Sequence, residues 1–219
     1  MTNGDLSYLT IALPKGKLFQ PSADMLGKLG LTCENLQENS RKLVLVNETE
    51  KVKYIITKTA DLPTYVEYGA ADIGIIGKDV LLEEAKDVYE LLDLGFGFCR
   101  MMVAVPGDRR KESLADYAHQ RVATKYTRTA ENFFRQQGIQ MEIIKLNGSI
   151  ELAPIVGLSE LIVDLVETGR TLKENNLQEI ARINTSTARL IANRVSFKMK
   201  FSRINSLVEG LRKMLKNGE

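Results

Sequence analysis

Short apolar runs alternate along this chain with segments whose apolar residues recur every three or four positions. The runs predict strands, and the periodic segments between them predict helices. The predicted strands cover residues 8–13, 43–46, 52–57, 70–76, 101–105, 122–125, 143–146 and 161–166. Regular alternation favours an α/β fold with mostly parallel sheets, because parallel neighbours need a crossover connection between them.

Several residues mark where the predicted helices begin and end. Gly30, Gly69 and Gly138 each follow a helical segment, and glycine favours the left-handed turn that ends a helix. Asp79 is placed to cap another helix. One long helix with a single apolar stripe is predicted at the end of the chain, and the stripe consists of Phe197, Phe201, Ile204, Val208, Leu211 and Leu215. The stripe is expected to pack on the body of the protein, with a subunit interface as the alternative.

Two breaks in the pattern suggest the domain organisation. The first is the Gly-Phe-Gly-Phe sequence at 95–98, and the second is the polar stretch 184–187. If the chain crosses between lobes at both, residues 1–96 plus 185–219 form a discontinuous lobe I and residues 97–184 form lobe II. A ligand is then expected in the cleft between the lobes.

Composition excludes several classes of protein. A net charge of +2 provides no basic field for nucleic acid. Cys33 and Cys99 do not form the spaced set that a disulfide framework or metal site requires. No apolar run approaches the roughly 20 residues that span a bilayer, and the short polar start of the chain does not read as a signal peptide. These features predict a cytoplasmic protein with no nucleic-acid partner and no membrane association.

Residues 162–172 say most about function, because a buried strand there ends in the sequence Glu-Thr-Gly-Arg-Thr. Gly169 permits a tight turn. The amides of 168–171, two hydroxyls and one guanidinium are then able to surround a phosphate. Asp164, near the strand end, is expected to face a sugar hydroxyl or a bound Mg²⁺ ion. The segment resembles the phosphoribosyl-pyrophosphate (PRPP) loop of phosphoribosyltransferases, and the alternative is an ordinary strand-to-helix turn.

Two further segments bear on ligand binding. Lys15, Gly16 and Lys17 follow a strand and open a helix, where polyanions bind in open α/β sheets, although lysines are also common on such surfaces. Gly74 lies inside a predicted strand, which implies close approach to the backbone by either a nucleotide or a neighbouring helix.

Groups for acid–base or metal catalysis are scarce. Ser149, in the segment 147–154, is interpreted as a helix cap, and His119, the single histidine, as a solvated residue. No Ser-His-Asp, Cys-His or metal-ligand cluster is present. Phosphoribosyl transfer to a ring nitrogen needs neither a strong base nor a metal cage, since Mg²⁺ arrives on the substrate phosphates.

Taken in order, the motifs resemble the short form of the ATP phosphoribosyltransferase family, over residues 9 to about 215. The resemblance is carried by LPKGKL at 13–18, DLPTYVEYGAADIGIIGKD at 61–79, VATKY at 122–126, LNGSIELAP at 146–154, DLVETGRTL at 164–172 and ARLIANRVS at 188–196. It implies transfer of phosphoribose from PRPP to N1 of ATP, with Mg²⁺, as the first step of histidine biosynthesis. It also implies a two-lobed, periplasmic-binding-protein-like (type II) fold with a cleft between the lobes.

The resemblance also assigns residues to roles. Asp164 and Lys15 are implied to be catalytic, with Asp164 on the ribose. PRPP would be bound by Asp164 together with the loop residues Glu167, Thr168, Gly169, Arg170 and Thr171. ATP or pyrophosphate would be bound by Lys15, Gly16 and Lys17, with Asp72 and Arg100 lining the opposite lobe of the cleft.

A short-form chain is implied to act in a hetero-octamer with a histidyl-tRNA-synthetase-like regulatory subunit, through which histidine would exert feedback. Three positions depart from the family pattern: Glu160 replaces an aspartate, Lys58 an arginine and Thr127 a proline. A lysine lacks the bidentate geometry of arginine, so no phosphate role is given to Lys58, and Glu160 is left out of the site. The alternatives are a phosphoribosyltransferase for free purine or pyrimidine bases and a non-catalytic solute-binding protein of similar fold.

Overall fold

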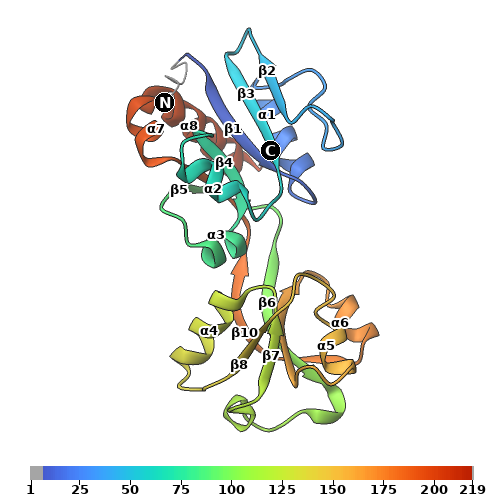
Figure 1. The fold of residues 1–219 in the computed structure, drawn as a ribbon. Helices are drawn as coiled ribbons and strands as arrows, with labels where there is room; N and C mark the ends of the chain where they lie inside the picture. Colours follow the sequence, from blue (N-terminus) through green and yellow to red (C-terminus); the bar gives the residue numbers. More distant parts are fainter. Residues whose placement is uncertain (1–6, 219) are drawn as a thin grey trace. The chain divides into compact units, whose positions relative to one another are not determined.

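The structure is a computed structural model that describes residues 7–218, and it divides into two compact units. Unit 1 contains the described residues up to Gly97 and from Thr187 onward, and unit 2 contains Phe98–Ser186. Each unit has its own sheet (Figure 1). The first boundary between the units lies one residue after the predicted one, and the second lies two residues after it. No helix among the described residues is both long and apolar enough to cross a membrane.

The sheet of unit 1 has six strands in the order β2-β3-β1-β4-β11-β5. Strand β1 runs parallel to β3 and β4, whereas β2, β11 and β5 pair antiparallel with their neighbours. The strands are β1 Leu9–Pro14, β2 Val44–Asn47, β3 Val52–Thr57, β4 Ile73–Gly77, β5 Tyr89–Asp93 and β11 Ala188–Ala192. The helices are α1 Phe19–Lys28, α2 Leu62–Glu67, α3 Lys78–Glu84, α7 Arg194–Met199 and α8 Phe201–Asn217.

Both faces of this sheet are covered. Helices α1 and α8 pack on one face, and α2 and α3 pack on the other. At Gly74 in β4, an added Cβ atom would lie 2.7 Å from Leu62 Cδ2 and 3.0 Å from Val66 Cγ2 of α2. A neighbouring helix is therefore what approaches the backbone at this glycine.

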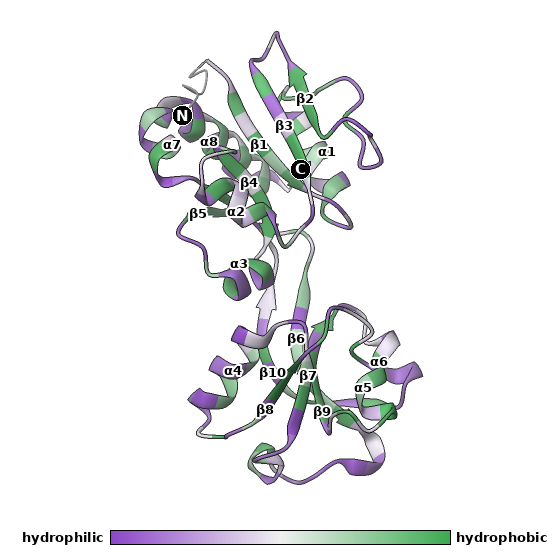
Figure 2. Ribbon diagram, viewed as in Figure 1, coloured by the Kyte–Doolittle hydropathy of each residue, from purple (hydrophilic) through white to green (hydrophobic). Residues whose placement is uncertain are grey.

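The sheet of unit 2 has five strands in the order β10-β6-β9-β7-β8. Strands β8, β7 and β9 are mutually parallel, and β6 runs antiparallel to both β9 and β10. The strands are β6 Cys99–Pro106, β7 Arg121–Thr124, β8 Glu142–Lys145, β9 Leu161–Val166 and β10 Leu177–Ser186. The helices are η1 Gly107–Arg109, η2 Leu114–Tyr117, α4 Thr127–Gln136, α5 Leu152–Ile155 and α6 Arg170–Glu174. In both units the strands are largely hydrophobic and the loops largely hydrophilic (Figure 2).

The α/β class is confirmed, but the prediction of mostly parallel sheets is wrong, because both sheets are mixed. Two other local predictions are also wrong. The N-cap of α3 is Gly77, which has no side chain to cap the helix, and Asp79 is the second residue of the helix. The C-terminal stripe belongs to two helices, α7 and α8, which are separated at Lys200.

Lys200, at the break between α7 and α8, is held by side-chain contacts. Its ammonium group donates to the carboxylate of Asp72 at 2.7 Å and to the carbonyl of Tyr8 at 2.6 Å. The Asp72 carboxylate also accepts from the amide of Thr10 at 2.7 Å. This buried pair ties the start of α8 to β1 and to the residue before β4.

Candidate functional site

The carboxyl ends of the parallel strands β7, β8 and β9 meet at one edge of the sheet in unit 2. Lys125 follows β7, residues 146–150 follow β8, and Glu167 follows β9. Ligands of open α/β sheets bind outside the carboxyl ends of strands. Three of the segments singled out from the sequence therefore converge at this edge.

The loop after β9 turns sharply at Gly169, which has φ of +78° and precedes the first residue of α6. Buried Val166 and Leu172 anchor the loop on either side. The hydroxyl of Thr168 accepts a long bond, 3.4 Å, from the amide of Arg170. Thr168, Arg170 and Thr171 are exposed, as is Glu167. The loop therefore presents hydroxyls and a guanidinium to solvent, which is the donor set that a phosphate group requires.

Asp164 stands on β9 on the same face as the buried residues Ile162 and Val166. The pKa of this carboxyl is raised to about 6, chiefly by burial and to a smaller extent by the charge of Glu151. A bond from the Leu165 amide at 2.8 Å and the nearby charge of Lys125 act in the opposite direction. A carboxyl held this way gains from a cation or a hydroxyl brought by a ligand.

Glu151 and Lys125 were not predicted as site residues, although both segments were singled out. Lys125 directly follows β7, the neighbour of β9, and Glu151 lies in the segment after β8. Their closeness to Asp164 can be inferred only once the strand order is known. Ser149 does not cap α5, contrary to its interpretation from sequence. The N-cap of that helix is Glu151, which makes no side-chain cap bond.

Arg100 lies on β6 in unit 2, opposite Val166 of β9. The expectation that it lines the opposite lobe from the loop is therefore wrong, because β6 is a neighbour of β9 in the same sheet. Its guanidinium makes a two-bond pair with Glu179, at 3.0 and 3.1 Å. Glu179 Oε1 lies 3.7 Å from the point where a Cβ atom on Gly169 would stand. The Arg100–Glu179 pair therefore lies next to the turn at Gly169.

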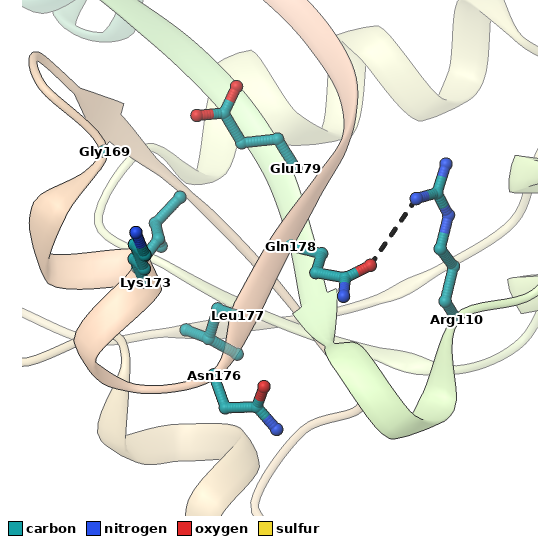
Figure 3. A pocket seen from close by; sticks show the side chains of 8 residues that line it. Arg110, Gly169, Lys173, Asn176, Leu177, Gln178 and Glu179 are labelled. Carbon is teal, nitrogen blue, oxygen red and sulfur yellow. Dashed lines mark hydrogen bonds between the residues drawn. The ribbon is translucent and has the colours of Figure 1, made fainter.

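An open depression of about 600 Å³ lies beside the loop (Figure 3). It is lined by Arg110, Gly169, Leu172, Lys173, Asn176, Leu177, Gln178 and Glu179. Arg110 reaches Gln178 at 3.5 Å across it. This polar hollow adjoins the loop through Gly169 and α6.

In unit 1, Lys15, Gly16 and Lys17 follow β1 and are exposed. The backbone of Lys15 is held on both sides, by the carbonyl of Thr57 at 2.9 Å and by the hydroxyl of Thr59 at 3.0 Å. Within residues 7–218 the ammonium of Lys15 has no hydrogen-bond or ion-pair partner. It therefore projects a charge that a ligand phosphate is able to use.

Other predicted residues are engaged in the fold. The Gly16 amide donates to a carboxylate oxygen of Glu38 at 2.7 Å, and Asp72 is held by Lys200 and Thr10 as described above. Glu160 pairs with Arg121 and accepts from its amide at 2.9 Å, so it fixes the start of β7.

The part of the chain that the structure describes contains no group of three or more His, Cys, Asp and Glu residues arranged to hold a metal ion. His119 is exposed, and its amide donates to the carbonyl of Gln140 at 2.7 Å. Mg²⁺ carried by substrate phosphates remains a prediction.

Comparison with known proteins identifies what this arrangement resembles. A family model described as "HisG: ATP phosphoribosyltransferase" matches residues 58–213. A protein named ATP phosphoribosyltransferase from Desulfitobacterium hafniense is 56% identical over 216 residues, which is 95% of this chain and 97% of that protein. One of the same name from Moorella thermoacetica is 51% identical over 217 residues, covering 97% and 95%.

Solved structures agree. A chain of the "ATP phosphoribosyl transferase (HisG:HisZ) complex" from Thermotoga maritima superposes with a TM-score of 0.82 at 34% identity, covering 95% of this chain and 99% of that one. The substrate-binding protein of an amino-acid ABC transporter superposes with a TM-score of 0.61 at 14% identity, covering 97% and 95%. The second likeness concerns the fold alone, and it confirms the two-lobed type II class.

Proposed function

The chain belongs to the ATP phosphoribosyltransferase family, and from this premise we propose that it transfers the 5-phosphoribosyl group of PRPP to N1 of ATP. The products are N1-(5-phosphoribosyl)-ATP and pyrophosphate, in the first step of histidine biosynthesis. The observation that carries the proposal is the placement of Asp164 at the edge of the sheet where the exposed Thr168–Thr171 loop, Lys125 and Glu151 also lie.

Each group has a distinct task in this reaction. The Thr168–Thr171 loop binds the 5′-phosphate of PRPP through amides and hydroxyls, while the Arg170 guanidinium, which pairs with exposed Glu174, adds charge. Asp164 accepts from a ribose hydroxyl and favours the positive charge that develops on the sugar. Lys15 binds the triphosphate of ATP or the departing pyrophosphate.

No general base is required, since N1 of adenine carries a free lone pair. The chain's contribution is positioning and preorganised charge. Mg²⁺ would be held by the phosphates of PRPP and offset the charge of the leaving pyrophosphate. The ionised form of Asp164 suits this preorganised charge. Burial stabilises its carboxylate poorly, so the carboxylate gains from the positive charge that develops on the ribose.

We further propose that the chain acts in the cytoplasm, within a hetero-octamer that includes a histidyl-tRNA-synthetase-like regulatory subunit. Support comes from the Thermotoga maritima relative, which was solved as a HisG:HisZ complex and is covered by this chain over nearly its full length. Histidine would then act through the partner.

The test is PRPP- and Mg²⁺-dependent conversion of ATP to its N1-phosphoribosyl adduct, followed by adenine absorbance and product mass. Adduct formed only with the regulatory subunit of the same genome supports both reaction and dependence. Adduct formed by this chain alone supports the reaction and contradicts the dependence. No adduct in either case, with both proteins folded, contradicts the function and directs the search to free bases as acceptors.

Replacing Thr168 with alanine is expected to raise KM for PRPP about tenfold, since one hydroxyl bond to a charged phosphate is lost. The melting temperature should stay within about a degree, because the Thr168 side chain is exposed. Steady-state kinetics and thermal melts measure both. Thr49→Ala, at an exposed threonine of unit 1, is the matched control, and wild-type KM in Thr168→Ala would contradict the loop assignment.

The pH profile should show the titration of Asp164. If the ionised carboxylate meets the ribose, kcat/KM for PRPP falls about tenfold per unit below pH 6, the value to which burial raises the pKa. The limb should be absent in Asp164→Asn. A flat wild-type profile from pH 5 to 8 would contradict the assignment.

Replacing Asp72 with asparagine separates its two possible roles. Loss of the buried pair with Lys200 is expected to lower the free energy of unfolding by about 2 kcal/mol. If Asp72 also binds ATP, as the resemblance implies, KM for ATP rises as well. Denaturant unfolding and kinetics distinguish these outcomes, with exposed Asp61→Asn as control.

A further inference from the structure

The peptide group that joins Lys15 to Gly16 is held at both ends. Its carbonyl, on Lys15, accepts a hydrogen bond from the hydroxyl of Thr59 at 3.0 Å, and its N–H, on Gly16, donates to Glu38 Oε1 at 2.7 Å. The amide of Lys15 donates in turn to the carbonyl of Thr57 at 2.9 Å. Because these other contacts fix the peptide plane, the Gly16 N–H keeps its direction when the Glu38 carboxylate moves away.

The surroundings of Gly16 are open and basic. Apart from its two chain neighbours, no described residue has an atom within 4 Å of the point where a Cβ atom on Gly16 would stand. Lys15 and Lys17 flank this glycine and are exposed. Lys58, also exposed, directly follows Thr57, whose carbonyl holds Lys15. A backbone N–H at an open position beside ammonium groups favours an anion.

The anion that occupies this amide is a side chain of the protein itself. Glu38 belongs to the segment 29–43, which connects α1 to β2 without a helix or strand. Its carboxylate is half-buried, and within residues 7–218 it has no second hydrogen bond and no ion pair. A single bond to the Gly16 amide therefore holds this carboxylate in place.

We propose that the Glu38 carboxylate takes the place of a phosphate oxygen at the Gly16 amide and gives way when a polyphosphate binds. The ligand is the triphosphate of ATP or the departing pyrophosphate, so the inference rests on the proposed function and adds a residue that sets the affinity of that site. A carboxylate and a phosphate both accept charge-assisted bonds from a backbone N–H, and they compete for this one.

The competition has a predictable size. If Glu38 occupies the amide for about nine-tenths of the time, the polyphosphate binds about tenfold more weakly than it would to a free amide. Glu38 thus lowers the affinity for ATP and shortens the residence of pyrophosphate after the reaction.

Calorimetric titration of the full chain with Mg²⁺ and pyrophosphate measures this competition. Glu38→Ala removes the competitor and is expected to lower the Kd for pyrophosphate about tenfold. Glu38→Gln keeps an uncharged oxygen in the same place and should lower the Kd by a smaller factor, roughly threefold. A purely structural Glu38 predicts the reverse, with a wild-type Kd in the glutamine variant and weaker binding in the alanine variant. Glu34→Gln, at an exposed glutamate of the same segment, is the matched control and should keep the wild-type Kd.

The Gly16 amide reports the exchange of partners directly. The sequence contains one Lys-Gly pair, at 15–16, so lysine labelled with carbonyl ¹³C and glycine labelled with ¹⁵N select a single peptide bond for NMR. Without ligand, this resonance in Glu38→Ala should lie away from its wild-type position, because the charged acceptor is gone. Saturating Mg²⁺ and pyrophosphate should bring the two resonances together, because a phosphate oxygen is then the acceptor in both proteins.

The enzymatic assay adds a readout that a structural role would not move. In Glu38→Ala, KM for ATP and the inhibition constant of pyrophosphate should fall by the same factor. Thermal melts of all variants establish that they are folded at the assay temperature.

Three outcomes would overturn the proposal: a wild-type Gly16 resonance that pyrophosphate leaves unmoved, two resonances that stay apart at saturation, or a Kd that is unchanged or raised in Glu38→Gln. A raised Kd would assign Glu38 to the metal ion carried by the phosphates. Pyrophosphate binding requires no turnover, so competition by Glu38 in a chain that forms no adduct would contradict the proposed reaction alone.

Discussion

Asp164→Asn is expected to lower kcat/KM for PRPP by a hundredfold to about a thousandfold while leaving the protein at least as heat-stable as the wild type. The kinetic loss follows because a neutral amide cannot favour the positive charge that develops on the ribose. The gain in stability follows from the carboxyl's surroundings. Its pKa rises from 3.8 in the unfolded chain to about 6 in the folded one, so the folded protein binds the neutral form better.

The sign of the pH dependence follows from this difference. The free energy of unfolding falls as pH rises from about 4 to about 6, because the unfolded chain ionises first, and it is flat above that range. At pH 7 the buried charge costs on the order of 3 kcal/mol, and asparagine removes that cost. Active sites commonly retain such costly groups because function depends on them.

The matched control is Asp108→Asn, at an exposed aspartate of the same unit, which should change neither property. Kinetics at pH 7.5 and melts at pH 5 and 7.5 are sufficient. An Asp164→Asn enzyme with wild-type kcat/KM would remove this residue from the site. A large fall in melting temperature would instead assign it a structural role.

Lys15→Ala is expected to reduce kcat/KM for ATP about a hundredfold, the effect of losing a charged donor to a polyphosphate. The melting temperature should change little, although the kinetic constants for ATP change strongly. The reason is that the backbone of Lys15, not its ammonium, makes the contacts with Thr57 and Thr59.

Two variants sharpen this experiment. Lys15→Arg keeps the charge, so it should recover part of the activity, and Lys213→Ala, at an exposed lysine of α8, should behave like wild type. If Lys15→Ala uses ATP normally, the lysines after β1 are only part of the surface. A loss confined to PRPP kinetics would assign Lys15 to the other substrate.

The strands that were predicted from sequence are those whose residues are nearly all apolar, such as β9 and β4. Strand β10 was missed because polar residues such as Gln178, Arg182 and Asn184 recur along it, and it pairs through β-bulges that disturb alternation. Strand β11 was missed because a single residue, Thr187, separates it from the end of β10. These two strands add three of the antiparallel pairs, but β2 with β3 and β6 with β9 make both sheets mixed without them, so the missed strands account for only part of the error in topology.

The site was predicted where chemistry is local in the sequence, as in the loop at Gly169 and at Asp164. It was not predictable where partners come from distant segments. The pairing of Asp72 with Lys200 joins residues 128 positions apart, and that of Arg100 with Glu179 joins residues 79 apart. A lone aspartate or arginine looks the same in a sequence whether it awaits a ligand or already has a partner.

The position of β11 has a consequence for the order in which the protein is made. Unit 2 is one uninterrupted stretch, so a ribosome has released everything it needs once Ser186 has emerged. Unit 1 is begun first and finished last, because β11 inserts between β4 and β5 of its sheet. Until then β4 and β5 have no partner on the sides that β11 will occupy. The nascent chain therefore exposes two unpaired strand edges while roughly half its length is synthesised. Chaperones are most needed during that interval, because unpaired edges favour aggregation.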